Sequence, residues 1–314
     1  MSTASIDTAR ITERLSAFLS RVEEAEPVDN IFVDLPTLNE AMKSKMTIDG
    51  GRQSMIALDT AQNSTIASFS GYDTFNLTPQ DTARTAVYAF INYGGTVTIS
   101  WEEMRETSNS DVRVFDLVAH KRRNAIASMK DRINSDLYVA VPAALDINSI
   151  PQLISTTAAA GGIAAGGFWA AQENAAVGAF AANGLVNMRD SWNDVVRQGQ
   201  GTPDTTLTTQ AIFQAYEAAI DPDVRYSSAD KLSRGATVLE WKGKPIMFDA
   251  DMTAGEMYMI NWKWIKLYVD TDGNFNLDKF IEPSNQKAYT AKLVFRGQMV
   301  MDNRRALARL AGIT

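Results

Sequence analysis

Residues 67–90 read ASFSGYDTFNLTPQDTARTAVYAF, and the pattern changes partway along this stretch. The first half is polar and interrupted by Gly71, whereas from Ala86 onward apolar and polar residues alternate, as is typical of a half-buried strand. A polar, glycine-broken ribbon has little of its own to pack against, and an isolated two-stranded hairpin is only marginally stable in water. We therefore expect the ribbon to gain its stability from a neighbour.

The ribbon extends upstream and is predicted to span residues 47–81. Two short runs, SMIALD at 54–59 and STIASFS at 64–70, flank a polar turn candidate at 60–63, so we expect them to pair as a long hairpin. The ribbon contains few apolar side chains that another molecule could cover. They are Met55, Ile56, Leu58, Ile66 and Phe69.

Downstream, the alternation predicts two strands joined by a turn at Gly94 and Gly95. Apolar residues share one face on each side of that turn. They are Ala86, Tyr88 and Phe90, then Val97, Ile99 and Trp101. Ser100 precedes Glu102 and Glu103, a pattern that predicts a capped helix start with acidic residues in the first turn.

The most regular helical pattern covers residues 112–137, where apolar residues recur at spacings of three or four, with Arg122 filling the one gap in the series. A helix of about 25 residues would be roughly 38 Å long. The residues that carry this pattern are Phe115, Val118, Ile126, Met129, Ile133 and Leu137.

The other segments predict a mixture of helices and strands. An amphipathic helix is expected at 6–24, followed by an extended arm with a short helical piece before residue 46. Helices are expected at 185–198 and after Thr209, a hairpin turn at 242–244, and one long half-buried strand at 288–302. Together these elements indicate an α+β fold.

Composition excludes several classes of protein. The 314 residues include no cysteine, which removes disulfides, thiolate metal sites and cysteine nucleophiles. A formal charge of −7 argues against a protein that coats DNA over its whole surface. Residues 1–15 carry acidic residues before any apolar run, and residues 172–174 interrupt the small-residue segment at 158–186, so neither a signal peptide nor a membrane span is expected.

No motif predicts catalysis, a cofactor or a metal ion. The one histidine, His120, has no local partners for such chemistry. DTDGNFNLD at 270–278 does not match a calcium loop, because Phe275 occupies the position of the required glycine; we expect an acidic turn in which Gly273 has a positive φ. GGIAAGG at 161–167 lacks the Lys-Ser/Thr of a phosphate loop.

One modest basic cluster lies on the predicted long helix. It consists of Lys121, Arg122 and Arg123, with Lys130 further along. A solvated helix face is the default interpretation of such a cluster, and a surface that faces DNA is the sharper one.

The order of these elements, with the segment SGYDTFNLTPQDTARTAVYAFINYGGTVTISWEEM at 70–104, resembles the major capsid proteins of tailed phages, which have the Hong Kong ninety-seven fold. QMVMDNRRALARL at 298–310 is similar to the closing strand of the peripheral domain in that family. The resemblance implies five parts. They are an N-terminal arm at 1–46, an extended loop at 47–81, a peripheral domain with its spine helix at 82–140, an axial domain with return strands at 141–283, and a closing peripheral strand with the C-terminal segment at 284–314.

The resemblance also implies a function and partners. The chain would assemble with itself as hexamers and pentamers into an icosahedral virion shell around double-stranded DNA, inside the host cytoplasm. A scaffolding protein, a portal and possible decoration proteins would be its partners. Some family members join their shells through a lysine in the extended loop, but no lysine occurs between Lys45 and Lys121, so that bond is not expected. An encapsulin-type compartment and, from another class, a metabolic enzyme with a pocket near 161–167 are the alternatives.

Overall fold

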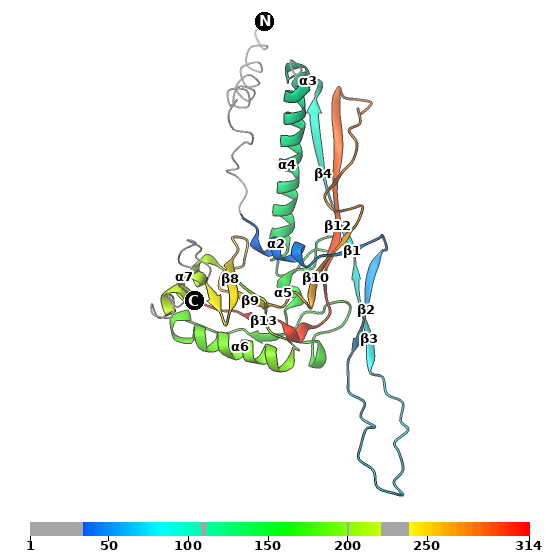
Figure 1. The fold of residues 1–314 in the computed structure, drawn as a ribbon, viewed down its shortest axis with the longest axis vertical. Coiled ribbons are helices and arrows are strands. Elements are labelled where there is room, and N and C mark those ends of the chain that lie inside the picture. Colours follow the sequence, from blue (N-terminus) through cyan, green and yellow to red (C-terminus); the bar gives the residue numbers. More distant parts are fainter. Residues whose placement is uncertain (1–33, 108–110, 200, 221–238) are drawn as a thin grey trace. The chain divides into compact units, whose positions relative to one another are not determined.

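The computed structural model describes residues 34–107, 111–199, 201–220 and 239–314 (Figure 1). Residues 34–314 belong to one compact unit. The helix predicted at 6–24 lies outside the described residues. The described residues form both helices and three sheets, so the α+β prediction is confirmed.

The long helix is confirmed as α4, Asp111–Asp136. It runs beside strand β4, Ile91–Ser100 (Figure 1). The helix buries Met129 and Ile133 on its face toward the core. The helix before it, α3 (Trp101–Thr107), starts with the predicted cap: the Ser100 hydroxyl accepts from the Glu103 amide at 3.1 Å, and the Glu103 carboxylate accepts from the Ser100 amide at 3.1 Å. This reciprocal pair is a capping box.

A five-stranded sheet is organised around β12, Ala288–Met301. β4 pairs along one side of β12, and β10 (Ile265–Asp270) and β11 (Asn276–Leu277) pair along the other. β1, Met46–Ile48, adds a parallel strand to β10. The predicted turn at Gly94 and Gly95 is wrong, because both glycines lie inside β4 opposite Val294 and Leu293.

The predicted pairing within the ribbon is also wrong. β2, Gln53–Asp59, pairs with β3, Ala83–Ala89, rather than with residues 64–70. The ribbon therefore consists of β2 and β3 and of the segment 60–82 that joins them, which we call the tip (Figure 1). The two strands end together, since the Thr60 amide donates to the Thr82 carbonyl at 2.7 Å.

A six-stranded sheet forms a second layer with its own helices. Its strand order is β5 (Gln172–Asn174), β13 (Ala308–Leu310), β9 (Met257–Ile260), β6 (Thr205–Thr208), β8 (Lys244–Phe248) and β7 (Glu240–Trp241). The helices predicted for this region are confirmed as α6 (Leu185–Gln198) and α7 (Gln210–Ala219), which pack their apolar faces on the sheet. The hairpin turn predicted at 242–244 is confirmed, with Lys242 and Gly243 in the left-handed region.

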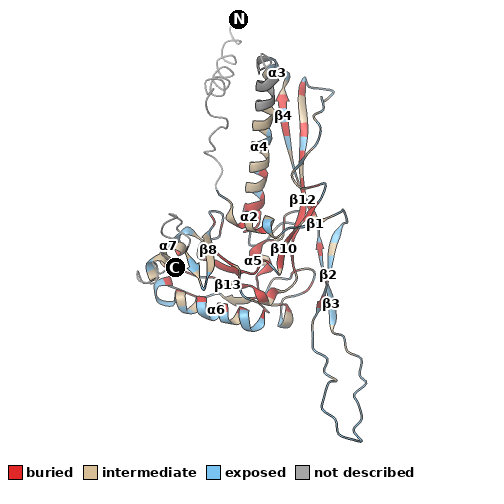
Figure 2. Ribbon diagram, viewed as in Figure 1, coloured by how far each residue is buried: buried red, intermediate tan, exposed pale blue. Residues whose placement is uncertain are grey.

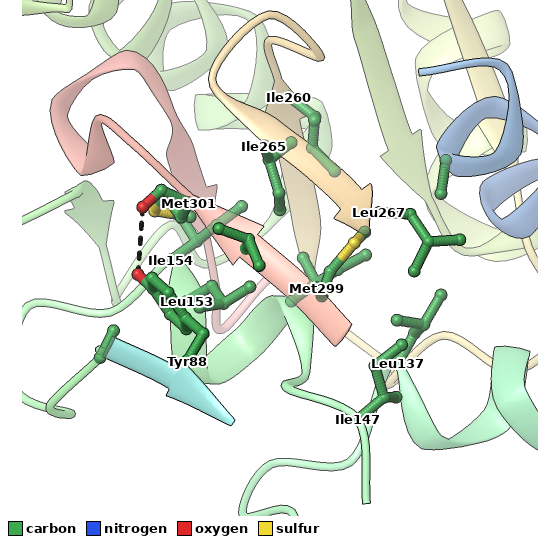
Figure 3. Close-up of a cluster of buried hydrophobic side chains, with 14 of the residues drawn as sticks. Tyr88, Leu137, Ile147, Leu153, Ile154, Ile260, Ile265, Leu267, Met299 and Met301 are labelled. Atoms are coloured by element: carbon green, nitrogen blue, oxygen red, sulfur yellow. Dashed lines mark hydrogen bonds between the residues drawn. The ribbon is translucent and has the colours of Figure 1, made fainter. Parts of the chain in front are cut away.

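One of the two apolar clusters in the described part of the chain contains residues from both large sheets (Figure 3). The buried residues lie mainly where these sheets and α4 meet (Figure 2). This cluster includes Leu137 from the end of α4, Leu153 from α5 (Ile150–Leu153), and Met299 and Met301 from β12. The short helix expected before residue 46 is α2, Pro36–Lys43, which buries Leu38 and Ala41 in the same cluster. Residues 36–43 are thus packed into their own protomer.

The acidic turn after β10 differs from the prediction in one detail. Phe275, rather than Gly273, adopts a positive φ, of 50°. Gly273 is required for a different reason: a Cβ there would lie 2.7 Å from the Cβ of Arg296 on β12.

Candidate assembly surface

The tip of the ribbon is exposed. Its large apolar side chains have exposed fractions of 81% for Ile66, 65% for Phe69, 105% for Tyr72, 67% for Phe75 and 89% for Leu77. Their one described aromatic contact is between the rings of Phe69 and Phe75, whose centroids lie 5.1 Å apart. Soluble proteins rarely leave such a group of apolar residues uncovered, so this is a candidate interaction surface.

The hydrogen bonds of the tip are local. Asn63 and Asn76 each accept bonds from the residue two positions later, and the Ser64 hydroxyl donates to Gln80 at 2.8 Å. These bonds belong to Asx turns and one cross-ribbon contact. They give the backbone a defined path while leaving the apolar side chains in solvent.

The end of the ribbon opposite the tip, around Gly51 and residues 86–89, is bonded to β12, and we call this end the root. Tyr88 donates to the Met301 carbonyl at 3.1 Å (Figure 3). The Gln298 amide nitrogen donates to the Ala89 carbonyl at 3.0 Å. Arg296 binds Asp270 at 2.8 Å and donates to the carbonyl of Gly51. Burial of Tyr88 raises the pKa of its phenol, so the hydroxyl keeps the proton that it donates. One end of the ribbon is therefore anchored and the other is uncovered.

The five apolar residues predicted to face a neighbour divide into two groups. Met55, Ile66 and Phe69 are exposed, Met55 at 64%. Leu58 is only 8% exposed and Ile56 packs partly on the core cluster, so their assignment to a neighbour-facing surface is corrected. The reason is the alternation of β2, which turns these two side chains toward the protomer once β2 pairs with β3.

Sequence reasoning missed Tyr72, Phe75 and Leu77. A usable signal was present, because these residues stand singly among polar residues and turn formers at 70–82, with no periodicity that would give them a buried face.

The predicted basic cluster is not one uniform patch. Lys121 forms an ion pair with Glu103 at 2.6 Å, and Lys130 lies over the ring of Phe275 at 5.6 Å. Arg122 and Arg123 are exposed. His120 beside them is partly buried, and this burial, followed by the charges of Arg123 and Lys121, lowers its pKa. Lys121 and Lys130 therefore have the partners named above, and the side chains of Arg122 and Arg123 are exposed.

A cavity of about 330 Å³ adjoins the root of the ribbon and residues 159–162 of the glycine-rich loop. Two ionisable residues line it, Tyr88 and Asp146. The Tyr88 hydroxyl donates to Met301, and the Asp146 carboxylate accepts from the Ala143 amide at 3.2 Å. The cavity therefore contains no acid and base placed to act together.

The glycine-rich loop is shaped by packing. Gly161 has a φ of +60°, its carbonyl accepts from the Val87 amide at 2.9 Å, and a Cβ at this position would lie 2.8 Å from the Cβ of Ala86. A fully buried arginine, Arg304, holds the segment around it. Its guanidinium and Nε donate to five main-chain carbonyls, at 2.6–3.2 Å, those of Gln152, Leu153, Ser155, Ala158 and Trp169.

Two kinds of feature are absent from the described residues. They contain no group of three or more His, Asp or Glu residues placed to hold a metal ion. None of their helices combines the length and the apolar character needed to cross a bilayer.

Comparison with solved structures places this architecture. The capsid protein of cyanophage A-1(L) is 17% identical, with 95% of this chain and 98% of that chain covered at a TM-score of 0.65. The capsid of an empty GTA particle is 13% identical, with coverages of 95% and 96% and a TM-score of 0.62. The holo encapsulin complex of Synechococcus elongatus is 11% identical, with coverages of 96% and 95% and a TM-score of 0.56.

The fold is therefore that of viral capsid proteins. In particular, it is the Hong Kong ninety-seven type found in tailed phages, and the sequence-based prediction of this fold is confirmed. No family model and no curated protein matches the sequence.

Proposed function

We propose that this chain is the major capsid protein of a tailed phage, which assembles as hexamers and pentamers into an icosahedral shell around double-stranded DNA. The observation that carries the proposal is the ribbon, because its root is bonded to β12 while its tip exposes Ile66, Phe69, Tyr72, Phe75 and Leu77. A protomer of this kind is completed by copies of itself, since apolar surface left in water favours association.

The partners follow from this role. Copies of the chain cover one another's ribbons, a scaffolding protein and a portal guide closure, and decoration proteins bind the finished shell. The protein is located in the virion shell, and assembly takes place in the host cytoplasm. A net charge of −7 suits a wall that must not bind its packed DNA tightly. Arg122 and Arg123 are the exposed cations that we assign to local contact with DNA.

We expect no catalytic activity, since the cavity beside the glycine-rich loop has no acid and base in partnership. A second candidate is an encapsulin-type compartment that holds proteins rather than DNA. It is favoured by one observation, the likeness to the encapsulin of Synechococcus elongatus at a TM-score of 0.56.

Electron microscopy of the full chain, purified from cells that express it, tests the proposal. We expect closed shells, and shells isolated from the native host should contain nuclease-protected DNA. Shells that enclose protein cargo instead of DNA would favour the encapsulin function. A protein that stays a small oligomer at high concentration in both preparations would overturn the proposal.

Charge reversal of Arg122 and Arg123 to Glu should lower DNA retention without lowering the yield of shells, and unchanged retention would remove these residues from the DNA-facing surface.

A further inference from the structure

Strand β4 contains two adjacent glycines, Gly94 and Gly95, that the protomer does not require. Neither has a positive φ. A Cβ at Gly94 would meet nothing within 4 Å, and a Cβ at Gly95 would lie 3.6 Å from the terminal methyl group of Met129, an ordinary contact. Glycine in the interior of a strand lowers stability, because it gains no packing and loses more backbone entropy on folding.

Another glycine of the same sheet shows the contrast. Gly297 on β12 is sterically required, since a Cβ there would lie 2.5 Å from the carbonyl oxygen of Tyr268. Packing thus explains Gly297 but leaves Gly94 and Gly95 without a reason inside the protomer.

The two unexplained glycines point to opposite faces of the strand. Along β4 the exposed and inward positions alternate, so that Gly94 and Thr96 face solvent whereas Gly95 faces α4. A partner that passes over the outer face would account for Gly94 alone. Two successive glycines on both faces are better explained by freedom of the backbone itself.

The surroundings allow β4 to bend at this point. Over the residues that the structure describes, β4 pairs with β12 alone, so its other edge carries no second strand. β12 is supported directly opposite, where β11 pairs with Leu293 and Val294. The neighbour on the inner face is Met129, an unbranched side chain that adapts to small shifts.

We propose that Gly94 and Gly95 form a bending point in β4 that lets one sequence take up the several curvatures that a closed shell demands. This inference rests on the proposed function, because hexamers and pentamers place identical chains in different surroundings. Bending at β4 changes the angle between the end of the sheet that carries residues 96–100 and the end at the ribbon root.

The test is the double variant Gly94→Thr with Gly95→Ala. Threonine matches Thr96 on the outer face, and alanine fits the 3.6 Å space next to Met129. We expect the unassembled variant to unfold about 1–3 °C above the wild type. In electron micrographs we expect closed shells of wild-type diameter to fall at least about tenfold, with tubes, open sheets or shells of another diameter in their place. The matched control is Thr96→Val, which raises strand propensity on the same face but keeps both glycines, and should give wild-type shells.

The possible outcomes separate the bending point at Gly94 and Gly95 from the proposed capsid function. Wild-type shells from the double variant, or a lower melting temperature, would overturn the bending point. Complete loss of association between variant protomers would also overturn it, because a neighbour would then be contacting the glycines directly. If the wild-type chain itself formed no shells, the proposed function would fail and this inference with it.

Discussion

Three substitutions in the tip separate folding from assembly: Phe69→Ser, Phe75→Ser and Leu77→Ser in one chain. These side chains are 65%, 67% and 89% exposed, so the protomer covers about a third of each phenylalanine and less of Leu77. Their covered parts together contribute about 1–2 kcal/mol to protomer stability, including the ring contact between Phe69 and Phe75.

The same substitutions should strongly affect assembly. Complete burial of one such side chain contributes about 1.5–3 kcal/mol, so covering the exposed part of all three supplies roughly 3–7 kcal/mol per subunit. A loss of about 3 kcal/mol raises the protein concentration needed for association by about 100-fold. Thermal unfolding should show a nearly unchanged protomer, while sedimentation velocity should show that closed shells have disappeared.

The control keeps the apolar character of the tip: Phe69→Leu, Phe75→Leu and Leu77→Met. This variant should assemble at nearly the wild-type concentration. If the serine variant also gave closed shells at that concentration, the tip would not be an interface and the reasoning from exposed apolar area would be refuted.

Three further predictions concern the protomer itself. Arg304→Met removes the donors of five carbonyls, three in buried bonds and two in partly buried ones, and should lower the free energy of unfolding by about 3–5 kcal/mol in urea titrations; a loss under 1 kcal/mol would mean that water replaces the guanidinium. Gly161→Ala should lower stability by about 2–3 kcal/mol, because the new methyl group meets Ala86; Gly162→Ala, with a φ of +75° and open space, should lower it by about 1 kcal/mol, and equal losses would contradict the packing argument. Burial raises the pKa of Tyr216 to about 12, above its unfolded value near 10. The stability that the protonated phenol gives the folded state is therefore fully present below pH 10 and is lost as the pH rises to 12. When the pH rises from 10 to 11, the free energy of unfolding of Tyr216→Phe should therefore fall by about 1 kcal/mol less than that of the wild type. If the free energy of unfolding fell equally steeply with pH in both proteins, Tyr216 would ionise freely in the folded state.

Elements governed by local chemistry could be predicted from the sequence. The spacing of apolar residues along α4 and the Ser100 and Glu103 pair before it gave a helix and a cap that the structure contains. The turn at Lys242 and Gly243 is equally local, because the residues adopt the backbone angles that a tight turn needs. Such features depend on residues within a few positions of one another.

The parts that could not be predicted depend on distant pairing. β2 passes over a nearer candidate and pairs with β3, and this choice is what buries Leu58. Gly94 and Gly95 looked like a turn, yet Leu293 and Val294, almost 200 residues away, hold them within a strand. Arg304 gave no signal at all, since its five acceptors lie within residues 152–169, which precede it by 135–152 residues.

Because β12 is synthesised after the strands that pair with it, it sets the order in which the protein can fold on the ribosome. β4, β10, β11 and the root of the ribbon all wait for residues 288–301, and the loop at 152–169 waits for Arg304. At a synthesis rate of about 5–20 residues per second, β4 and the ribbon spend many seconds without their central strand. A chain released before that point lacks the strand on which β4, β10 and β11 pair, so a broken translation product cannot form the five-stranded sheet.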